Sequence, residues 1–204
     1  MSYQLLKEDV LFYQRFLKSI GYYQGLLDGY WGPVTARADD QFVAETHRIA
    51  DKYGRFDPRT ESSINTLVPA AQVVARQFMK AGVKKTDVRI LSGTRTYSEQ
   101  NALYAHGRFG NKSPVITRAK GGQSNHNFGI AWDIGLFDKK GIYLGNDTPY
   151  ADFAAFILAK IPNIEWGGNW ISFRDMPHYQ LPSVSDSVAV VRRLFEKGKP
   201  YVVA

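Results

Sequence analysis

Hydrophobic residues recur at helical spacing near the start of the chain. Apolar side chains fall on one face between residues 5 and 20, at Leu6, Val10, Phe12, Tyr13, Phe16, Leu17 and Ile20. A stripe of this kind is typical of an amphipathic helix that packs against a core, and Gly21 stands where a helix C-cap would. We therefore predict a helix over residues 5–20.

A repeated turn-and-helix pattern follows this first helix. The run Gly29-x-Trp31-x-Pro33-x-Thr35 returns as Gly54-x-Phe56-x-Pro58-x-Thr60. Each copy places a glycine at a tight turn and a proline at the first position of a new helix. The pattern predicts a small three-helix module over residues 1–69, with Trp31 as a core residue.

From residue 70 onward, helical and strand-like segments alternate irregularly. Helices are predicted at 70–81, from Ser98, at 150–161 and at 185–197, and strands at 88–91, 128–137 and 178–181. A chain reversal near Lys139–Gly141 indicates a hairpin. These features favour an α+β fold with a mainly antiparallel sheet, rather than a doubly wound parallel one, over a second module at residues 70–204.

Charge is distributed unevenly between the two halves. Residues 1–70 hold 8 Lys and Arg against 9 Asp and Glu, whereas residues 71–204 hold 18 against 10. The basic second half fits an anionic partner, such as nucleic acid or a bacterial envelope. A basic surface that only aids solubility explains the charge as well. No nucleic-acid-binding motif accompanies it, so nucleic acid is not an expected partner.

Several classes of protein are disfavoured by what the sequence lacks. It has no cysteine, so any metal must be held by His, Asp or Glu. No apolar run approaches the ~18 residues of a membrane span, and membrane insertion is not expected. The first residues carry acidic side chains and no small-residue cleavage site, so they are not predicted to form a signal peptide.

The four histidines narrow the candidates for a metal site. His47 is expected on the surface of a helix, and His106 beside Gly107 at a helix end, with a capping or exposed role. The motif H-E-x-x-H is absent. His126 and His178 remain, each next to a predicted strand.

Two carboxylates accompany these two histidines. Asp133 lies on the strand that follows His126, and Asp175 comes three residues before His178. Two histidines and one aspartate would leave a fourth position open for water, as catalytic zinc sites do. From the spacing alone, His126 and His178 as separate polar residues remain the simpler interpretation.

Three blocks of sequence carry a resemblance to a known family. They are SGTRTYSEQNALYAHGR, TRAKGGQSNHNFGIAWDI and EWGGNWISFRDMPHYQL, in this order. The motif S-x-H-x-x-G-x-A-x-D resembles that of the LAS-type zinc peptidases. Over about residues 72–182 the blocks are similar to the L-alanyl-D-glutamate endopeptidase branch, which includes phage endolysins.

This resemblance implies a role for particular residues. It makes His126, Asp133 and His178 the ligands of one Zn²⁺ ion and Asp175 the catalytic base. It also places at Arg95 the arginine that contacts substrate and polarises the scissile carbonyl. Ser124 would hydrogen-bond a substrate carboxylate or simply form a turn.

The first module carries a second resemblance. The run VLFYQRFLKSIGYYQGLLDGYWGPVTARADDQF resembles the peptidoglycan-binding module of cell-wall hydrolases, over about residues 5–67. Its Tyr30 and Trp31 could stack on sugars, although a helical cap without a ligand would show the same pattern.

Together these features predict a monomeric peptidoglycan hydrolase that cuts the stem peptide, at the L-Ala–D-Glu bond in the preferred interpretation. It would be made in the cytoplasm and act on the cell wall after release, as phage lysins do. A D-Ala-D-Ala carboxypeptidase, a non-catalytic wall-binding protein and a nucleic-acid-binding protein are the alternatives.

Overall fold

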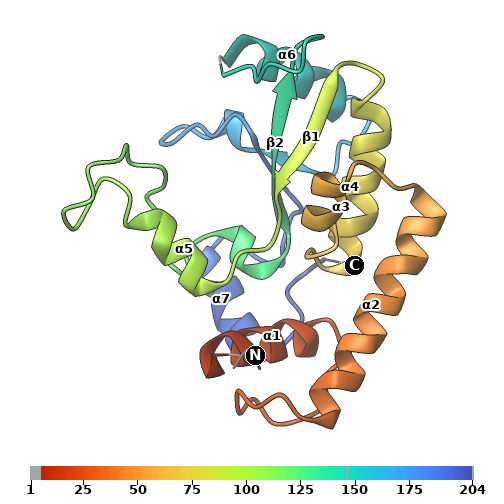
Figure 1. Cartoon of the computed structure of the whole chain (residues 1–204), viewed down its shortest axis with the longest axis vertical. Coiled ribbons are helices and arrows are strands. Elements are labelled where there is room, and N and C mark those ends of the chain that lie inside the picture. Colours follow the sequence, from red (N-terminus) through yellow and green to blue (C-terminus); the bar gives the residue numbers. More distant parts are fainter. Residues whose placement is uncertain (1–5, 146, 204) are drawn as a thin grey trace. The chain divides into compact units, whose positions relative to one another are not determined.

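The computed structural model describes residues 6–145 and 147–203 (Figure 1). Its elements are α1 (Lys7–Ser19), α2 (Pro33–Tyr53), α3 (Pro58–Ile64), α4 (Pro69–Gly82), β1 (Asp87–Ser92), α5 (Tyr97–Tyr104), η1 (Asn125–Phe128), β2 (Ala131–Phe137), α6 (Asp147–Leu158), β3 (Glu165–Trp166), η2 (Gly167–Asn169), β4 (His178–Gln180) and α7 (Val188–Glu196). Position 5 of the predicted first helix and the outer ends of the two predicted modules lie outside the described residues.

Among the described residues, four strands form one sheet. Their order is β1-β2-β4-β3, and each neighbouring pair is antiparallel. The predicted hairpin is present, because Phe137 at the end of β2 forms an antiparallel bridge with Tyr143. The α+β class and the mainly antiparallel sheet are thus confirmed, while α6 begins at Asp147, earlier than the sequence pattern predicted.

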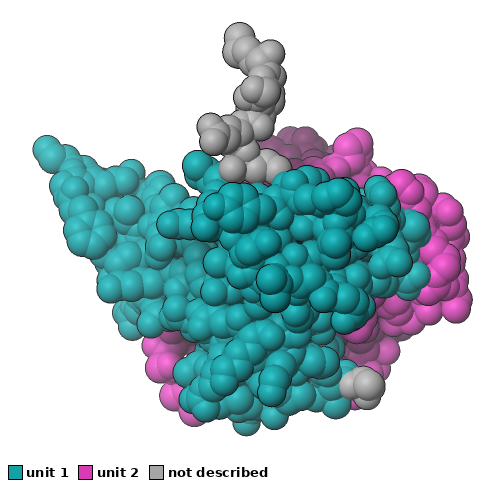
Figure 2. Space-filling model, turned by 90° about the horizontal axis from the view of Figure 1, so that it is seen from below, with its two compact units in different colours: residues 1–45, 95–128, 183–203 teal, residues 46–94, 129–182, 204 magenta. Residues whose placement is uncertain are grey.

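The chain folds into two compact units, each built from separate stretches of sequence (Figure 2). Unit 1 comprises residues 6–45, 95–128 and 183–203 of the described chain, and unit 2 comprises residues 46–94 and 129–182. The predicted boundary after residue 69 does not coincide with a boundary between these units. Whether residues 1–69 act as a wall-binding module therefore stays a prediction.

Aromatic side chains form the centre of unit 1. The ring of Phe195 in α7 lies with its centroid 5.2 Å from Phe12 of α1 and 5.3 Å from Phe128 of η1. Tyr201 packs against the same ring, and its hydroxyl donates a hydrogen bond of 2.6 Å to the carbonyl of Phe128. Helix α1 and the turn that carries His126 consequently share one core.

The core of unit 2 lies between helix α4 and one face of the sheet. Phe78 of α4 is buried against Trp132 of β2 and Tyr179 of β4, with ring centroids 5.8 and 4.8 Å away. Phe153 of α6 contacts the same ring from 5.7 Å. Edge-to-face pairs of this kind stabilise a core beyond the area that they bury.

A buried ion pair joins helices α3 and α4. Arg76 is fully buried, and its Nη1 lies 2.7 Å from Oε1 of Glu61. The same guanidinium donates to the carbonyl of Gly54 and to the side chain of Asn65. A buried charge is tolerated when it is paired in this way, so Arg76 fixes α3 on α4.

Trp31 does not occupy the core position that its sequence context predicted. Its side chain is 43% exposed and stacks on Tyr13 at 5.9 Å, while the neighbouring Tyr30 is 65% exposed. The core prediction for Trp31 is therefore wrong. Hydrophobicity alone does not separate an aromatic plug from an aromatic that lies flat on the surface.

No helix within residues 6–145 and 147–203 combines the length and the apolar character that crossing a membrane requires.

Candidate metal centre and active site

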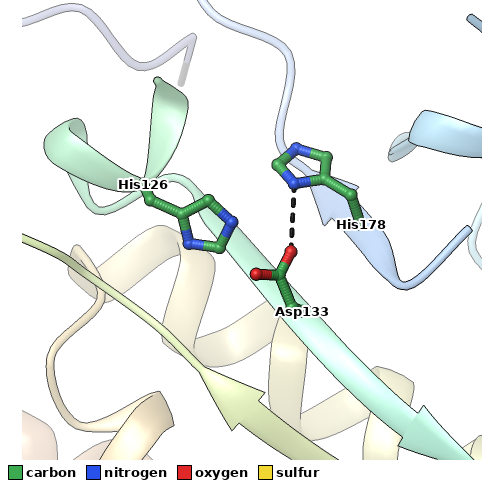
Figure 3. A group of neighbouring side chains, drawn as sticks. All are labelled: His126, Asp133 and His178. Carbon is green, nitrogen blue, oxygen red and sulfur yellow. Dashed lines mark hydrogen bonds and ion pairs between the residues drawn. The ribbon is translucent and has the colours of Figure 1, made fainter. Parts of the chain in front are cut away.

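Antiparallel pairing of β2 and β4 places two candidate ligands opposite each other. Asp133 and His178 are direct partners in the register, and the N–H of Ile134 donates to the carbonyl of Pro177 at 3.0 Å. Directly opposed residues point to the same face of a sheet. Nδ1 of His178 lies 3.2 Å from Oδ1 of Asp133 (Figure 3).

His126 comes from the short helical turn η1, just before β2. Its side chain is 1% exposed, and its carbonyl accepts a hydrogen bond of 3.1 Å from the N–H of Arg95. The next residue, Asn127, is fully buried and donates to the carbonyl of Arg95 at 2.9 Å. At Gly129 the backbone has φ of +66°, a conformation that glycine adopts without strain, and the chain then enters the strand.

His126, Asp133 and His178 together form a group that can hold one metal ion. Each offers one ligand atom, and these atoms all lie within 4.8 Å of one another. Figure 3 shows the three side chains turned toward one another from η1, β2 and β4. Two imidazoles and one carboxylate are the donors of catalytic zinc sites, in which water or substrate completes the coordination. The donor set therefore fits zinc.

The surroundings of His178 act on its charge in opposite directions. Burial alone would lower the pKa of this imidazole. The hydrogen bond to Asp133 and the negative charge of that carboxylate raise the pKa instead, with smaller contributions from Gln180 and Asp175, and the net effect is a raised pKa. Trp170 covers the ring from 4.8 Å.

Asp175, the predicted base, lies on the turn that leads into β4. Its carbonyl accepts a hydrogen bond of 3.2 Å from the N–H of His178, and its own N–H donates to the carbonyl of Gly167 at 3.1 Å. The indole N–H of Trp166 donates to the carbonyl of Met176 within the turn at 2.8 Å. The predicted base and a candidate ligand are thus carried by one hydrogen-bonded turn.

Gly167 allows this turn to lie close to the preceding segment. A Cβ atom at this position would lie 2.6 Å from the carbonyl oxygen of Asp175 and 3.0 Å from Cβ of His178. Both distances are shorter than ordinary van der Waals contacts, and the nearer neighbour is backbone. A side chain here would displace the turn that holds Asp175.

Two further predicted site residues lie close to His126: Arg95 through a backbone hydrogen bond, and Ser124 two positions earlier in the sequence. Arg95 is half-buried and is joined to His126 by the backbone hydrogen bond described above. The carbonyl of Ser124 accepts from the N–H of Asn127 at 2.9 Å, so this residue forms part of a turn. The substrate contacts of Arg95 and Ser124 stay predictions.

The other two histidines lie where the sequence pattern placed them. His47 is exposed on α2, and His106 follows the end of α5 in a turn, half-buried. Neither belongs to the group of ligands described above.

Three polar residues near the site, Asn127, Gln180 and Glu165, were not predicted from the sequence, because no motif or spacing marks them. Asn127 also accepts from the N–H of Gly122 at 2.9 Å and so holds the loop before η1. Gln180 lies on β4 and contacts both His178 and Glu165 of β3. Only the pairing of a two-residue strand brings Glu165 to this position, and no sequence pattern predicts so short a strand.

Fold and site together define a class, that of proteins with a two-histidine, one-carboxylate candidate metal centre on an antiparallel sheet. Comparison with known proteins gives a more particular result. Residues 117–181 match the sequence model of a peptidase M15 family described as D-alanyl-D-alanine carboxypeptidase. The matched segment contains the three candidate ligands and Asp175, which confirms the resemblance to zinc peptidases there.

Two individual proteins are also similar to this chain. Over 108 residues it is 39% identical to the peptidoglycan L-alanyl-D-glutamate endopeptidase CwlK of Bacillus subtilis (strain 168). That alignment covers 50% of this chain and 64% of CwlK, so the chain spans less than two thirds of its relative. The crystal structure of the L-Ala D-Glu endopeptidase ChiX of Serratia marcescens matches with 20% identity and a TM-score of 0.48, covering 65% of this chain and 92% of that one.

Proposed function

We propose that this chain is a zinc-dependent peptidoglycan hydrolase that cleaves the L-Ala–D-Glu bond of the stem peptide. The observation that carries the proposal is the group of His126, Asp133 and His178, with Asp175 on the turn beside His178. The identity to CwlK supports the choice of bond.

Each residue of the site has a defined task in this reaction. His126, Asp133 and His178 would hold the ion. When bound, zinc supplies Lewis-acid chemistry, which polarises a carbonyl and makes water acidic enough to attack at neutral pH. Asp175 accepts the proton of the attacking water and returns it to the leaving amine. Arg95 stabilises the negative charge that develops on the carbonyl oxygen.

Mass spectrometry of purified peptidoglycan after digestion tests the proposed bond. New amino groups are labelled, and an amino terminus on D-glutamate is the expected result. Release of free D-alanine would favour a D-Ala-D-Ala carboxypeptidase, the second candidate, which the description of the matched family supports. If zinc is bound and neither product forms, the catalytic proposal fails.

Substitution Asp175→Ala tests the base and separates an enzyme from a non-catalytic wall-binding protein. Loss of a general base lowers turnover by about 10²–10⁴-fold, whereas wall binding and zinc content should stay unchanged. Asp152→Ala, at an exposed carboxylate of α6, is the matched control and should cleave normally. Cleavage at the wild-type rate by the Asp175 variant would exclude this residue as the base.

For residues 1–69 we propose wall binding, which would raise the local concentration of the enzyme on its substrate. The support is the exposure of Tyr30 and Trp31, whose rings are suited to stacking on sugars, with the exposed apolar Leu26 nearby in the sequence. The double variant Tyr30→Ala, Trp31→Ala should sediment less with purified walls but cleave soluble fragments normally. Unchanged sedimentation would leave residues 1–69 without this role.

The cellular setting is also part of the proposal. The enzyme would act as a monomer on the wall after release from the cytoplasm, in the manner of a phage lysin, with no nucleic acid or membrane as partner. Sedimentation of the protein alone tests the monomer. Expression in bacteria with and without a separate membrane-lysis protein tests the proposed release from the cytoplasm. Lysis of cells that lack the membrane-lysis protein would exclude this mode of release.

A further inference from the structure

Both nitrogens of the His178 ring have a defined neighbour. Nδ1 faces Oδ1 of Asp133 at 3.2 Å, and Nε2 lies 3.0 Å from Oε1 of Gln180. An amide oxygen accepts hydrogen bonds and never donates them. Contact with Gln180 therefore requires a hydrogen on Nε2, and in the neutral ring this leaves the lone pair on Nδ1, beside Asp133.

The orientation of the Gln180 amide follows from a second contact. Its Nε2 donates to Oε2 of Glu165 at 2.7 Å. A carboxylate accepts only, so the NH₂ group of Gln180 must face Glu165 and its oxygen must face His178. The donor and acceptor of both hydrogen bonds are thus fixed: His178 donates to Gln180, and Gln180 donates to Glu165.

The sheet places these three side chains on one face. Gln180 is paired with Glu165 of β3 and lies two positions after His178 on β4, and side chains two apart along a strand point the same way. Gln180 is 8% exposed and His178 is 4% exposed. Little water reaches these contacts, so the hydrogen bonds are not readily exchanged for solvent.

We propose that Gln180 and Glu165 are positioning residues for the metal centre, which hold His178 with Nε2 protonated so that Nδ1 is the atom presented to the ion. The inference rests on the proposed zinc site. Outer partners of this kind fix the tautomer and orientation of a ligating imidazole and increase its basicity. The negative charge of Glu165 polarises the Gln180 amide and strengthens the hydrogen bond to the ring.

Zinc affinity and a spectroscopic signature test the proposal. The dissociation constant is measured by competition with a chelator for the wild type and for Gln180→Leu, which keeps the approximate size of the side chain and removes its polar atoms. Loss of an outer partner typically costs about 10–100-fold in metal affinity, and this loss is expected. Glu165→Gln keeps an acceptor for Gln180 but removes the charge, so a smaller loss is expected.

Gln72→Leu is the matched control. Gln72 is a fully buried glutamine of the same unit, and it donates to Thr46 and to the carbonyl of Leu67. This variant should lose thermal stability and keep its zinc affinity. An equal loss of zinc affinity in the Gln180 and Gln72 variants would show a merely structural role and overturn the proposal.

Nuclear magnetic resonance of the zinc-loaded wild type, with ¹⁵N-labelled histidine, gives a result that needs no variant to fold. The expected spectrum has a slowly exchanging Nε2–H for His178 and metal coordination at Nδ1. Coordination at Nε2 would overturn the proposal. Wall digestion by the wild type decides the proposed function separately, because a zinc site with this tautomer can exist whether or not the predicted bond is cut.

Discussion

Strands β2 and β4 carry different chemistry on their two faces. On one face Trp132 and Tyr179 are opposed in the register and stack at 6.5 Å, against Phe78 of helix α4. On the other face the next pair in the same register is Asp133 and His178. One residue along the backbone separates a packed aromatic core from a candidate metal centre.

The difference shows how a short sheet can support both stability and chemistry. Because side chains alternate along a strand, an aromatic layer on one face fixes the backbone that positions the ligands on the other. Substitutions on the apolar face should mainly lower stability, and substitutions on the polar face should mainly lower metal affinity. The following changes test this separation.

The largest loss of stability is expected for Trp132→Ala. The side chain is fully buried, and truncation of a buried Trp costs about 3–5 kcal/mol through lost burial and the cavity that remains. Denaturant unfolding of the metal-free protein measures the effect. Trp132→Phe should lose less, and an alanine variant as stable as the wild type would show that this face does not fix the sheet.

On the polar face, Asp133→Asn should lower zinc affinity by at least about 100-fold, beyond the effect of an outer partner. The stability of the metal-free protein should fall by at most about 1.5–3 kcal/mol, the contribution of a hydrogen bond to a charged group. Chelator competition and denaturant unfolding give the two values. If Asp133→Asn lost more free energy of unfolding than free energy of zinc binding, the two faces of the sheet would not differ in the way proposed.

Gly167→Ala tests the turn that connects the polar face to the predicted base. Its added methyl group would press on the carbonyl of Asp175, and overpacking of this kind costs about 1–3 kcal/mol. Cleavage should fall more than zinc affinity does, as measured on soluble wall fragments. Gly145→Ala, where the new Cβ would meet its neighbours at 3.6 Å or more, should behave as the wild type.

The smallest effect is expected for Tyr179→Phe on the apolar face. The Tyr179 hydroxyl is buried without a hydrogen-bond partner among the described residues. Its removal should stabilise the protein by about 1 kcal/mol at neutral pH. Differential scanning calorimetry is the measurement, and a lowered melting temperature would reveal a partner for this hydroxyl.

The same residue gives a pH dependence with a defined sign. Burial raises the pKa of Tyr179 above its ordinary value. The folded protein therefore binds its proton more tightly than the unfolded chain, so its contribution to stability is complete below pH about 10 and is lost as pH rises through the folded pKa. Unfolding measured at rising pH should show a shallower decline for Tyr179→Phe, by up to roughly 1.4 kcal/mol per pH unit.

The sequence pointed to the candidate ligands of the site, but not to the residues that support them. Spacing alone left His126 and His178 as separate polar residues, and only the resemblance carried by three ordered blocks predicted the group that the structure brings together with Asp133. The Gln180–Glu165 contact depends on the register of a two-residue strand. Sequence periodicity cannot specify that register, because it needs several alternations to be read.

The fold shows the same division between local and long-range information. Helices with clear stripes and proline starts were predicted correctly, including α1 and α2. An apolar stripe indicates that a helix packs against other parts of the protein, but it does not identify the partner. The sequence therefore did not predict that each compact unit is built from separate stretches of the chain. The core prediction for Trp31 was wrong for a related reason, because its partner is Tyr13 of α1, 18 positions earlier in the sequence, and the Trp31 side chain stays 43% exposed.

The contact between Trp170 and His178 makes the site optically observable. The two rings lie 4.8 Å apart, and the emission of an indole responds to the charge and environment of an imidazole beside it. Emission from Trp170 should therefore change as zinc is added, and Trp170→Phe should remove that part of the signal. Occupancy could then be followed in real time, without an added dye, while the protein works on its substrate.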